Sequence, residues 1–342
     1  MRPGSHIAGQ CFKLLLAVVL SAVGLSCGSP SGKSKPKTIS EMVFKAQKDA
    51  FVDKYSKIPR DEIIQQATSA RLYSEMKDYY KRALIELKVA ADKDCARLVL
   101  VVLSIEVGKD ATPANTYGIP FIMVTADNLG VDAYDLADSM AQRDLTPFTA
   151  TGGEGAWSKQ GAVYIADQLD AIISRYDTVR SSKHMSQDNK PKTFGDLDPN
   201  QDEVIYDYAD QGYHLKVNSQ GLRMDCDITF PKTKQTILIL GDGEVYNPML
   251  DNEFIATSIL QKRHPDKVIV NAGVPNYSMD DFESLYKDKA RFTEPDLVIV
   301  VTNGADILEQ YFTYRNKYSR LNHIYRPTDA ELQFYNFLYG KK

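Results

Sequence analysis

The sequence has little of what metal binding and nucleic-acid binding require. It contains four cysteines and five histidines in 342 residues, and these form no cluster with the spacing of a zinc site. The formal net charge is -4, so no excess of basic residues indicates a nucleic-acid partner. The composition, 43% hydrophobic and 25% charged, is that of an ordinary globular protein with one large or two medium domains. We therefore expect no metal, no cofactor and no nucleic acid.

The N-terminus also lacks an apolar stretch long enough to span a membrane, but it contains a shorter one. Arg2 and Lys13 precede an apolar run at 14–25, which is too short for a stable membrane span and fits the core of a signal peptide. The run closes at Gly24-Leu25-Ser26-Cys27. This pattern predicts a signal peptide at 1–26 and an extracytoplasmic protein.

The end of that run resembles a bacterial lipoprotein processing site, with Gly24 where Leu is usual. The resemblance implies that Cys27 becomes the lipid-bearing first residue of the mature chain and anchors it to a membrane, facing the periplasm or the cell surface. An ordinary cleaved signal with a chance cysteine is the alternative. Residues 27–40 are rich in Gly, Ser, Lys and Pro, as in a flexible tether. Cys95 and Cys226 then remain, and the sequence does not decide whether they pair.

The rest of the chain alternates buried-strand patterns with helical ones. The unbroken apolar run at 236–241 ends in Gly241-Asp242-Gly243, a sharp turn at the carboxyl end of a strand, where doubly wound sheets keep their ligand sites. Strands are predicted at 97–105, 120–126, 236–241, 267–272 and 296–301, and helices at 61–91, 132–143, 159–173, 251–262, 280–292 and 328–339. Loops are predicted at 108–118 and in a polar linker at 176–203, with short β segments at 203–230. This alternation predicts an α/β fold, an α/β/α sandwich around a five-stranded parallel sheet.

Several blocks are similar to the SGNH (GDSL-type) hydrolase and acyltransferase family. ILGDG at 239–243, NAGVPNYSMDDF at 271–282 and PDLVIVVTNGADIL at 295–308 look like its first three blocks, and VNSQGLR at 217–223 resembles what often precedes them. No Asp-x-His block follows Asp306. GEGAWSKQGAVYIADQL at 153–169 is instead similar to the family's closing loop and helix.

This order of blocks implies a circularly permuted SGNH-like domain at 41–342. Residues 41–175 would be the family's C-terminal half, 176–203 a linker and 204–342 its N-terminal half. The strand order would be flavodoxin-like, with 236–241 between 268–272 on one side and 296–301, 97–105 and 120–126 on the other. An alternative is a pair of half-domains completed by exchange between two chains.

The resemblance also implies which residues stand at the family's catalytic positions. The nucleophilic Ser is matched by Gly243, and the Gly whose N–H binds the oxyanion by Gly273. The oxyanion Asn and the closing Asp-x-His are matched by Ala305, Glu154 and Ala156, with Trp157 in the place of a common Trp. Because the nucleophile and the base act as a unit, their loss removes nearly all of the catalytic contribution.

A few polar residues at the predicted cleft remain as binding candidates: Asp242, Asn303, Asp306, Glu154 and Trp157. Clustered carboxylates can raise one another's pKa or hold a hard cation. We prefer the simpler interpretation, in which Asp242 and Asp306 cap turns and helix N-termini. The favoured function is a non-catalytic lipoprotein whose cleft binds an envelope glycan or a protein partner. The alternative is an esterase or O-acetyltransferase that acts on cell-envelope carbohydrate through a relocated nucleophile.

Overall fold

The structure is a computed structural model that describes residues 70–103, 113–136, 157–177, 190–208, 211–304 and 306–307. All of these residues belong to one compact unit. The expected signal peptide, Cys27, the tether and the helix at 328–339 lie outside the described residues. None of the described helices has both the length and the apolar character needed to cross a membrane.

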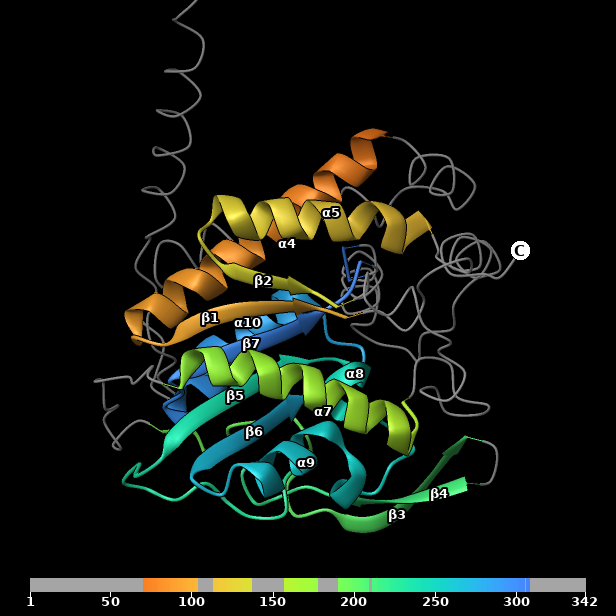
Figure 1. Ribbon diagram of the computed structural model, residues 1–342, viewed down its shortest axis with the longest axis vertical. Coiled ribbons are helices and arrows are strands. Elements are labelled where there is room, and N and C mark those ends of the chain that lie inside the picture. Colours follow the sequence, from red (N-terminus) through yellow and green to blue (C-terminus); the bar gives the residue numbers. More distant parts are fainter. Residues whose placement is uncertain are drawn as a thin grey trace, which may run out of the picture. The chain divides into compact units, whose positions relative to one another are not determined.

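The centre of the fold is a parallel sheet of five strands (Figure 1). Its order is β2 (Asp132–Asp135), β1 (Arg97–Val102), β7 (Leu297–Thr302), β5 (Gln235–Gly241) and β6 (Lys267–Gly273). The three inner strands are almost entirely buried, which explains their unbroken apolar sequences. The predicted α/β class is confirmed, and so is the pairing of 97–105 with 296–301.

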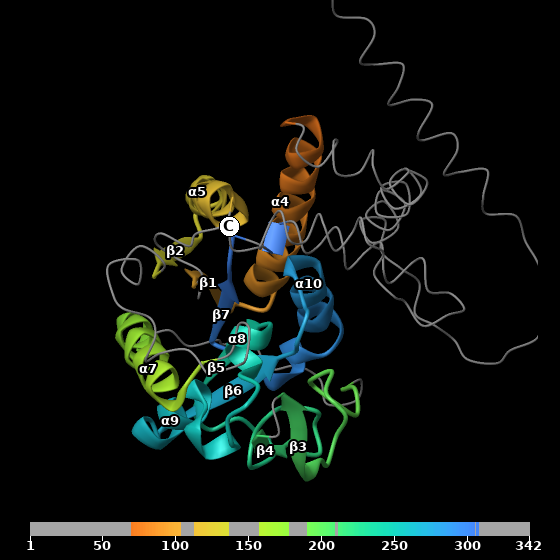
Figure 2. The same ribbon diagram turned by 90° about the vertical axis from the view of Figure 1, so that its right-hand side faces the viewer.

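Helices cover both faces of the sheet (Figure 2). On one face lie α7 (Lys159–Ile173) and α9 (Ala256–Arg263), which contact each other, and on the other lie α4 (Ala70–Lys93) and α10 (Met279–Asp288), which also make a pair. Ser158 caps α7 by accepting a hydrogen bond from the Gly161 N–H, as its sequence position predicts.

The strands supply core side chains to both helical layers, because successive side chains of a strand point to opposite faces of the sheet. Ile237 and Ile239 of β5 and Ile299 of β7 form one core cluster with Leu169 of α7 and Leu260 of α9. The alternate residues of the same strands are buried towards the other helical layer. The result is the three-layer arrangement that the sequence predicts.

The fifth strand was predicted wrongly. Residues 120–126 are not a strand but part of α5 (Pro113–Asn128), so the predicted loop at 108–118 is helical from Pro113 onward. The outer strand is instead β2, where the sequence analysis expected the start of a helix. A short apolar run does not distinguish a buried strand from a buried helix. From residue 118 onward, the buried positions of α5 are Gly118, Ile122, Thr125 and Ala126, which is the spacing of one helical face.

The segment before β5 contains the short β structure that was expected. β3 (Asp202–Tyr208) and β4 (Gln211–Lys216) form an antiparallel hairpin. Residues 190–201 of the polar linker contain no helix or strand, yet they are attached to the fold. Phe194 is 5% exposed and packs edge-on against Phe230.

The two cysteines in the described part of the chain are both exposed and both unpaired. Cys95 lies between α4 and β1, and Cys226 lies between β4 and β5. Cys95 and Cys226 therefore do not form a disulfide with each other, a point that the sequence leaves open.

The closest backbone approach of α5 gives a stability prediction. A Cβ added at Gly118 would lie 2.2 Å from the Gly304 carbonyl oxygen, which belongs to the loop after β7. Because both partners are backbone atoms, we expect Gly118→Ala to lower the free energy of unfolding by about 1–3 kcal/mol. Val124→Ala, at a side chain of α5 that is 60% exposed, should stay within about 0.5 kcal/mol of the wild type. Urea unfolding followed by circular dichroism measures both, and equal stabilities of the two variants would contradict the packing argument.

Candidate functional site

The turn from β5 into α8 (Gly243–Tyr246) lies at the carboxyl edge of the sheet. Asp242 is the N-cap of α8, and its Oδ1 accepts a hydrogen bond from the Glu244 N–H at 3.1 Å. The Val245 and Tyr246 N–H groups both donate to the Asp242 carbonyl oxygen. The Gly-Asp-Gly sequence therefore folds as a tight strand-to-helix turn, as the resemblance implies.

Glycine is required at two positions around this turn. A Cβ on Gly241 would lie 2.3 Å from Val245 Cγ2, and a Cβ on Gly273 would lie 2.4 Å from the Tyr246 nitrogen. Real Cβ atoms do not approach neighbours so closely, so α8 sits on the ends of β5 and β6 only because both residues lack a side chain.

Gly243 is different from these two glycines. A Cβ built on it meets no atom within 4 Å, although Gly243 is the first residue of α8 and stands where the sequence resemblance leads one to expect a nucleophile. The geometry of the turn therefore has room for a side chain that the sequence does not supply. Nothing in the packing of the described residues demands glycine at this position.

The loop after β7 contacts this turn through an amide. Asn303 Nδ2 donates to Glu244 Oε1 at 3.0 Å, which joins the two loops at the edge of the sheet. Glu244 is partly exposed and Asn303 is almost buried. A carboxylate and an amide thus stand beside the open position at Gly243.

Asp306 stabilises the turn that follows β7. Its Oδ2 accepts hydrogen bonds from Thr302 Oγ1 at 2.6 Å and from the Asn303 N–H at 3.2 Å, and Asn303 Oδ1 accepts from the Asp306 N–H at 3.1 Å. This reciprocal pattern is a capping box, and Asp306 is 1% exposed. Burial raises the pKa of Tyr80, whose hydroxyl lies 2.9 Å from Thr302 Oγ1, and the nearby Asp306 charge raises it further. The capping interpretation preferred for Asp242 and Asp306 is confirmed.

The glycine expected to bind an oxyanion has its N–H engaged. The Gly273 N–H donates to Asn271 Oδ1 at 2.9 Å, while Asn271 Nδ2 donates to the Val245 carbonyl and to Thr257 Oγ1. Asn271 is fully buried. Its side chain therefore ties β6 to α8 and α9 and occupies the Gly273 amide, which the sequence resemblance led us to expect at an oxyanion.

Arg223 also shapes this site, although its sequence context alone predicts no role for it. It is 1% exposed and donates to the carbonyl oxygens of Tyr246, Asn247 and Leu250 and to Asn252 Oδ1. Its guanidinium also lies over the Tyr246 ring, and burial lowers its pKa to about 10. Arg223 therefore holds the chain that leaves α8. Its one sequence signal is that it ends VNSQGLR, the stretch that resembles what often precedes the first family block.

The predicted cleft residues are not all in one place. Asp242, Asn303 and Asp306 lie at the carboxyl edge, whereas Trp157 is 0% exposed within the core cluster beneath α7. Glu154, Ala156 and Ala305 lie outside the described residues. In the described part of the chain, no three His, Cys, Asp or Glu residues are placed to hold a metal ion. His214 and His264 pair with Asp202 and Asp170 on outer elements, and neither bonds to a hydroxyl.

Asp242 makes the stability of the fold depend on pH. Burial in the turn raises the pKa of Asp242 to about 7, which a hydrogen bond from its own backbone only partly offsets. A raised carboxyl pKa stabilises the fold fully below the unfolded pKa of about 4, and the contribution is lost as pH rises through 7. Asp242→Asn keeps an acceptor oxygen for the Glu244 N–H and removes the titration. We expect its free energy of unfolding, relative to the wild type, to rise between pH 4 and pH 7. The slope should be smaller than the one-proton limit of about 1.4 kcal/mol per pH unit.

The control for this experiment separates titration from capping. Asp242→Ala also removes the titration but loses the cap, so it should show the same flattened pH dependence at a stability lower by about 1 kcal/mol. Chemical unfolding at several pH values gives all three curves. Parallel curves for the wild type and Asp242→Asn would show that Asp242 does not titrate in this range.

Comparisons with known proteins give distant structural likenesses. No protein-family model and no curated protein match the chain. One similar solved structure is the O-acetyltransferase domain of Pseudomonas putida AlgJ, 13% identical with a TM-score of 0.44, covering 73% of this chain and 93% of that one. Another is Pseudomonas aeruginosa AlgX, 15% identical with a TM-score of 0.38, covering 72% of this chain and 60% of that one. Similarity this remote identifies no activity, and the assignment of the fold rests on the order of the strands.

Proposed function

We propose that the protein is a non-catalytic, extracytoplasmic lipoprotein whose SGNH-like cleft binds an envelope glycan or a protein partner. The observation that carries this proposal is Gly243. The turn that presents a nucleophile is intact, with Gly241 and Gly273 in their required places and space for a side chain at Gly243, but no hydroxyl is present there.

The surroundings of Gly243 support the same conclusion. The Gly273 amide is engaged by Asn271, so the hydrogen-bond donor needed for an oxyanion is already committed. The position matched to the catalytic histidine is Ala156. Acyl transfer on this fold needs a nucleophile, a base and an oxyanion site, and each of the three is missing or altered.

The groups that remain at the edge of the sheet are suited to recognition. Glu244 is partly exposed beside the open position, and Asn303 engages only one of its two carboxylate oxygens, so the other can accept from a hydroxyl group or a backbone amide of a ligand. Binding at this place does not require a nucleophilic side chain. The adjacency of β1 and β7 is what a circularly permuted order of the family blocks requires, and it supports that part of the proposal.

Restoring the hydroxyl tests the loss of catalysis. We expect neither the wild type nor Gly243→Ser to hydrolyse p-nitrophenyl acetate above background or to react with a fluorophosphonate probe, because the base position stays empty. Since a side chain fits at 243, the variant should fold with wild-type stability, and unfolding curves will verify this. Turnover that disappears on changing a single Ser, Thr or His would instead establish the alternative, an esterase or O-acetyltransferase with a relocated nucleophile.

Lipid attachment has its own test. Cells that express the full chain and are fed radiolabelled palmitate should label the wild type, whereas Cys27→Ala should stay unlabelled and appear in the soluble extracytoplasmic fraction. Cys95→Ala is the matched control and should remain labelled. Label retained in the Cys27 variant would rule out the anchor at this residue.

A further inference from the structure

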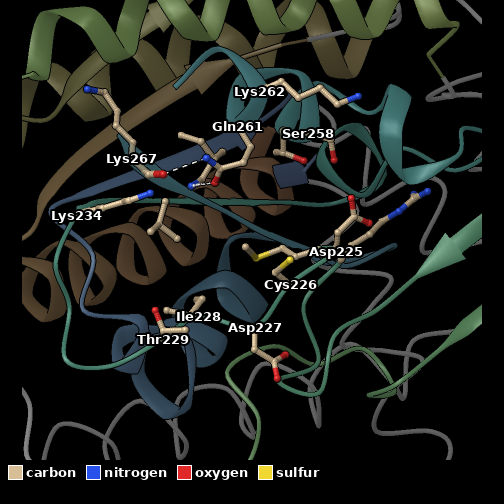
Figure 3. Close-up of a pocket in the computed structure, with 15 residues that line it drawn as sticks. Asp225, Cys226, Asp227, Ile228, Thr229, Lys234, Ser258, Gln261, Lys262 and Lys267 are labelled. Carbon is tan, nitrogen blue, oxygen red and sulfur yellow. Dashed lines mark hydrogen bonds between the residues drawn. The ribbon is translucent and has the colours of Figure 1, made fainter. Parts of the chain in front are cut away.

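A cavity of about 360 Å³ lies at the outer edge of the sheet, beside β6 (Figure 3). One wall is the segment 223–229, the other is α9, and residues 267–269 of the edge strand β6 line it as well. This volume is at the lower end of the range for small-molecule sites. The cavity is lined by different residues from those of the Gly243 turn, and none of the site residues predicted from the sequence lines it.

The wall formed by 223–229 is fixed by hydrogen bonds to residues 218–220. Three consecutive side chains each bond to the residue eight positions later. Asn218 Nδ2 donates to the Cys226 carbonyl (3.0 Å), Ser219 Oγ to Asp227 Oδ2 (2.6 Å), and the Gln220 amide exchanges two bonds with the Ile228 backbone (2.7 and 2.9 Å). Because these bonds fix the loop before any ligand arrives, the cavity is preorganised, which lowers the entropic cost of binding.

The edge strand is closed to a further strand in this region. Gln261 of α9 donates from Nε2 to the Lys267 carbonyl at 3.0 Å and accepts at Oε1 from the Ile269 N–H at 2.9 Å. These are the backbone groups that an added peptide strand would need. The cavity is therefore not a site for strand addition.

Three lysines surround the cavity, but their ammonium groups are engaged. Lys234 Nζ donates to the Pro265 carbonyl at 2.6 Å and Lys262 Nζ to the Glu253 carbonyl at 3.2 Å. Lys267 Nζ pairs with Asp177 at 3.1 Å. An anionic ligand would have to displace these bonds and would also meet the carboxylate of Asp225.

Four other polar side chains line the cavity, and none of them is a cation. Asp225, Cys226 and Thr229 on the loop and Ser258 on α9 make no side-chain hydrogen bond among the described residues. They supply one acceptor carboxylate and three groups that both donate and accept. Such a set matches hydroxyl groups, which are themselves donors and acceptors.

Apolar side chains form the remaining surface of the cavity. Met224 and Ile228 come from the loop, and Val268 and Ile269 from β6. A pyranose ring presents an apolar face of C–H groups and a polar rim of hydroxyls. The lining offers a counterpart to each.

We propose that this cavity binds a neutral saccharide unit, with the apolar ring face against Ile228 and Val268 and hydroxyls directed to Asp225 and Ser258. A cationic ligand would be repelled by the three lysines, and an anionic one by Asp225. This site is additional to the cleft of the proposed function, and it can exist whether or not that cleft binds a glycan.

The two free cysteines allow a direct test. Cys226 lines the cavity and Cys95 does not, while both are exposed. The full-length protein is alkylated with iodoacetamide, and the labelling rate of each cysteine is followed by peptide mass spectrometry. The probes are maltose and N,N′-diacetylchitobiose, with digalacturonate as the anionic comparison. At about 10 mM, a site with a Kd of 1 mM is roughly 90% filled, so one of the neutral disaccharides should slow alkylation of Cys226 about tenfold and leave Cys95 unchanged.

Three variants sharpen the test. Ser258→Phe fills the cavity and should abolish the protection of Cys226, and Asp225→Asn should weaken it without changing the size of the cavity. Gly243→Leu fills the open position of the other site and should leave the protection intact. Protection of Cys226 by a neutral disaccharide that is the same in the wild type and in Gly243→Leu would support the cavity, and it would show that the bound sugar does not occupy the Gly243 cleft.

Four results would overturn the proposal. The first is an unchanged Cys226 rate with both neutral disaccharides, and the second is stronger protection by digalacturonate than by either of them. The third is equal slowing of Cys226 and Cys95, which would show a general effect of the sugar solution. Protection that survives in a folded Ser258→Phe variant would place the ligand elsewhere and would overturn it as well.

Discussion

The contact on which the rest of the candidate site depends is the close approach of α8 to the ends of β5 and β6. Gly241 and Gly273 permit that approach because any Cβ at either position would overlap Val245 or the Tyr246 backbone. With α8 held there, Asp242 caps it, Glu244 meets Asn303, and the Tyr246 ring packs on the hairpin residues Tyr213 and Leu215. Without the two glycines, the strand-to-helix turn could not form in this geometry.

The buried polar residues around this turn maintain its shape. Asp306 and Asn303 cap each other, Asn271 ties β6 to α8 and α9, and Arg223 binds the chain that leaves α8. Each of these groups satisfies backbone or side-chain partners that burial would otherwise leave unpaired, which is costly in the protein interior. The architecture of the turn is thus stabilised by interactions that need no catalytic residue, and it can persist with glycine at 243.

Arg223 also connects the turn with the cavity at the edge of β6. Its guanidinium holds the segment after α8, while its backbone begins the loop that forms the cavity wall. The same loop is attached through Asn218, Ser219 and Gln220. One short motif, VNSQGLR, therefore supports both places where the structure offers groups for a ligand.

The sequence by itself determined the parallel sheet, four of its five strands and the turn at Asp242, because fully buried strands and glycine turns leave strong local patterns. It did not determine the fifth strand, since a short apolar run at 120–126 fits a buried strand and a buried helix equally well. In the fold this run is helical, with Gly118 against the Gly304 backbone and Ile122 fully buried. Only the tertiary structure decided that Arg223 is buried, that Asn271 occupies the Gly273 amide and that a cavity lies beside β6. These features depend on contacts between segments distant in sequence, and no local pattern of residues encodes such contacts.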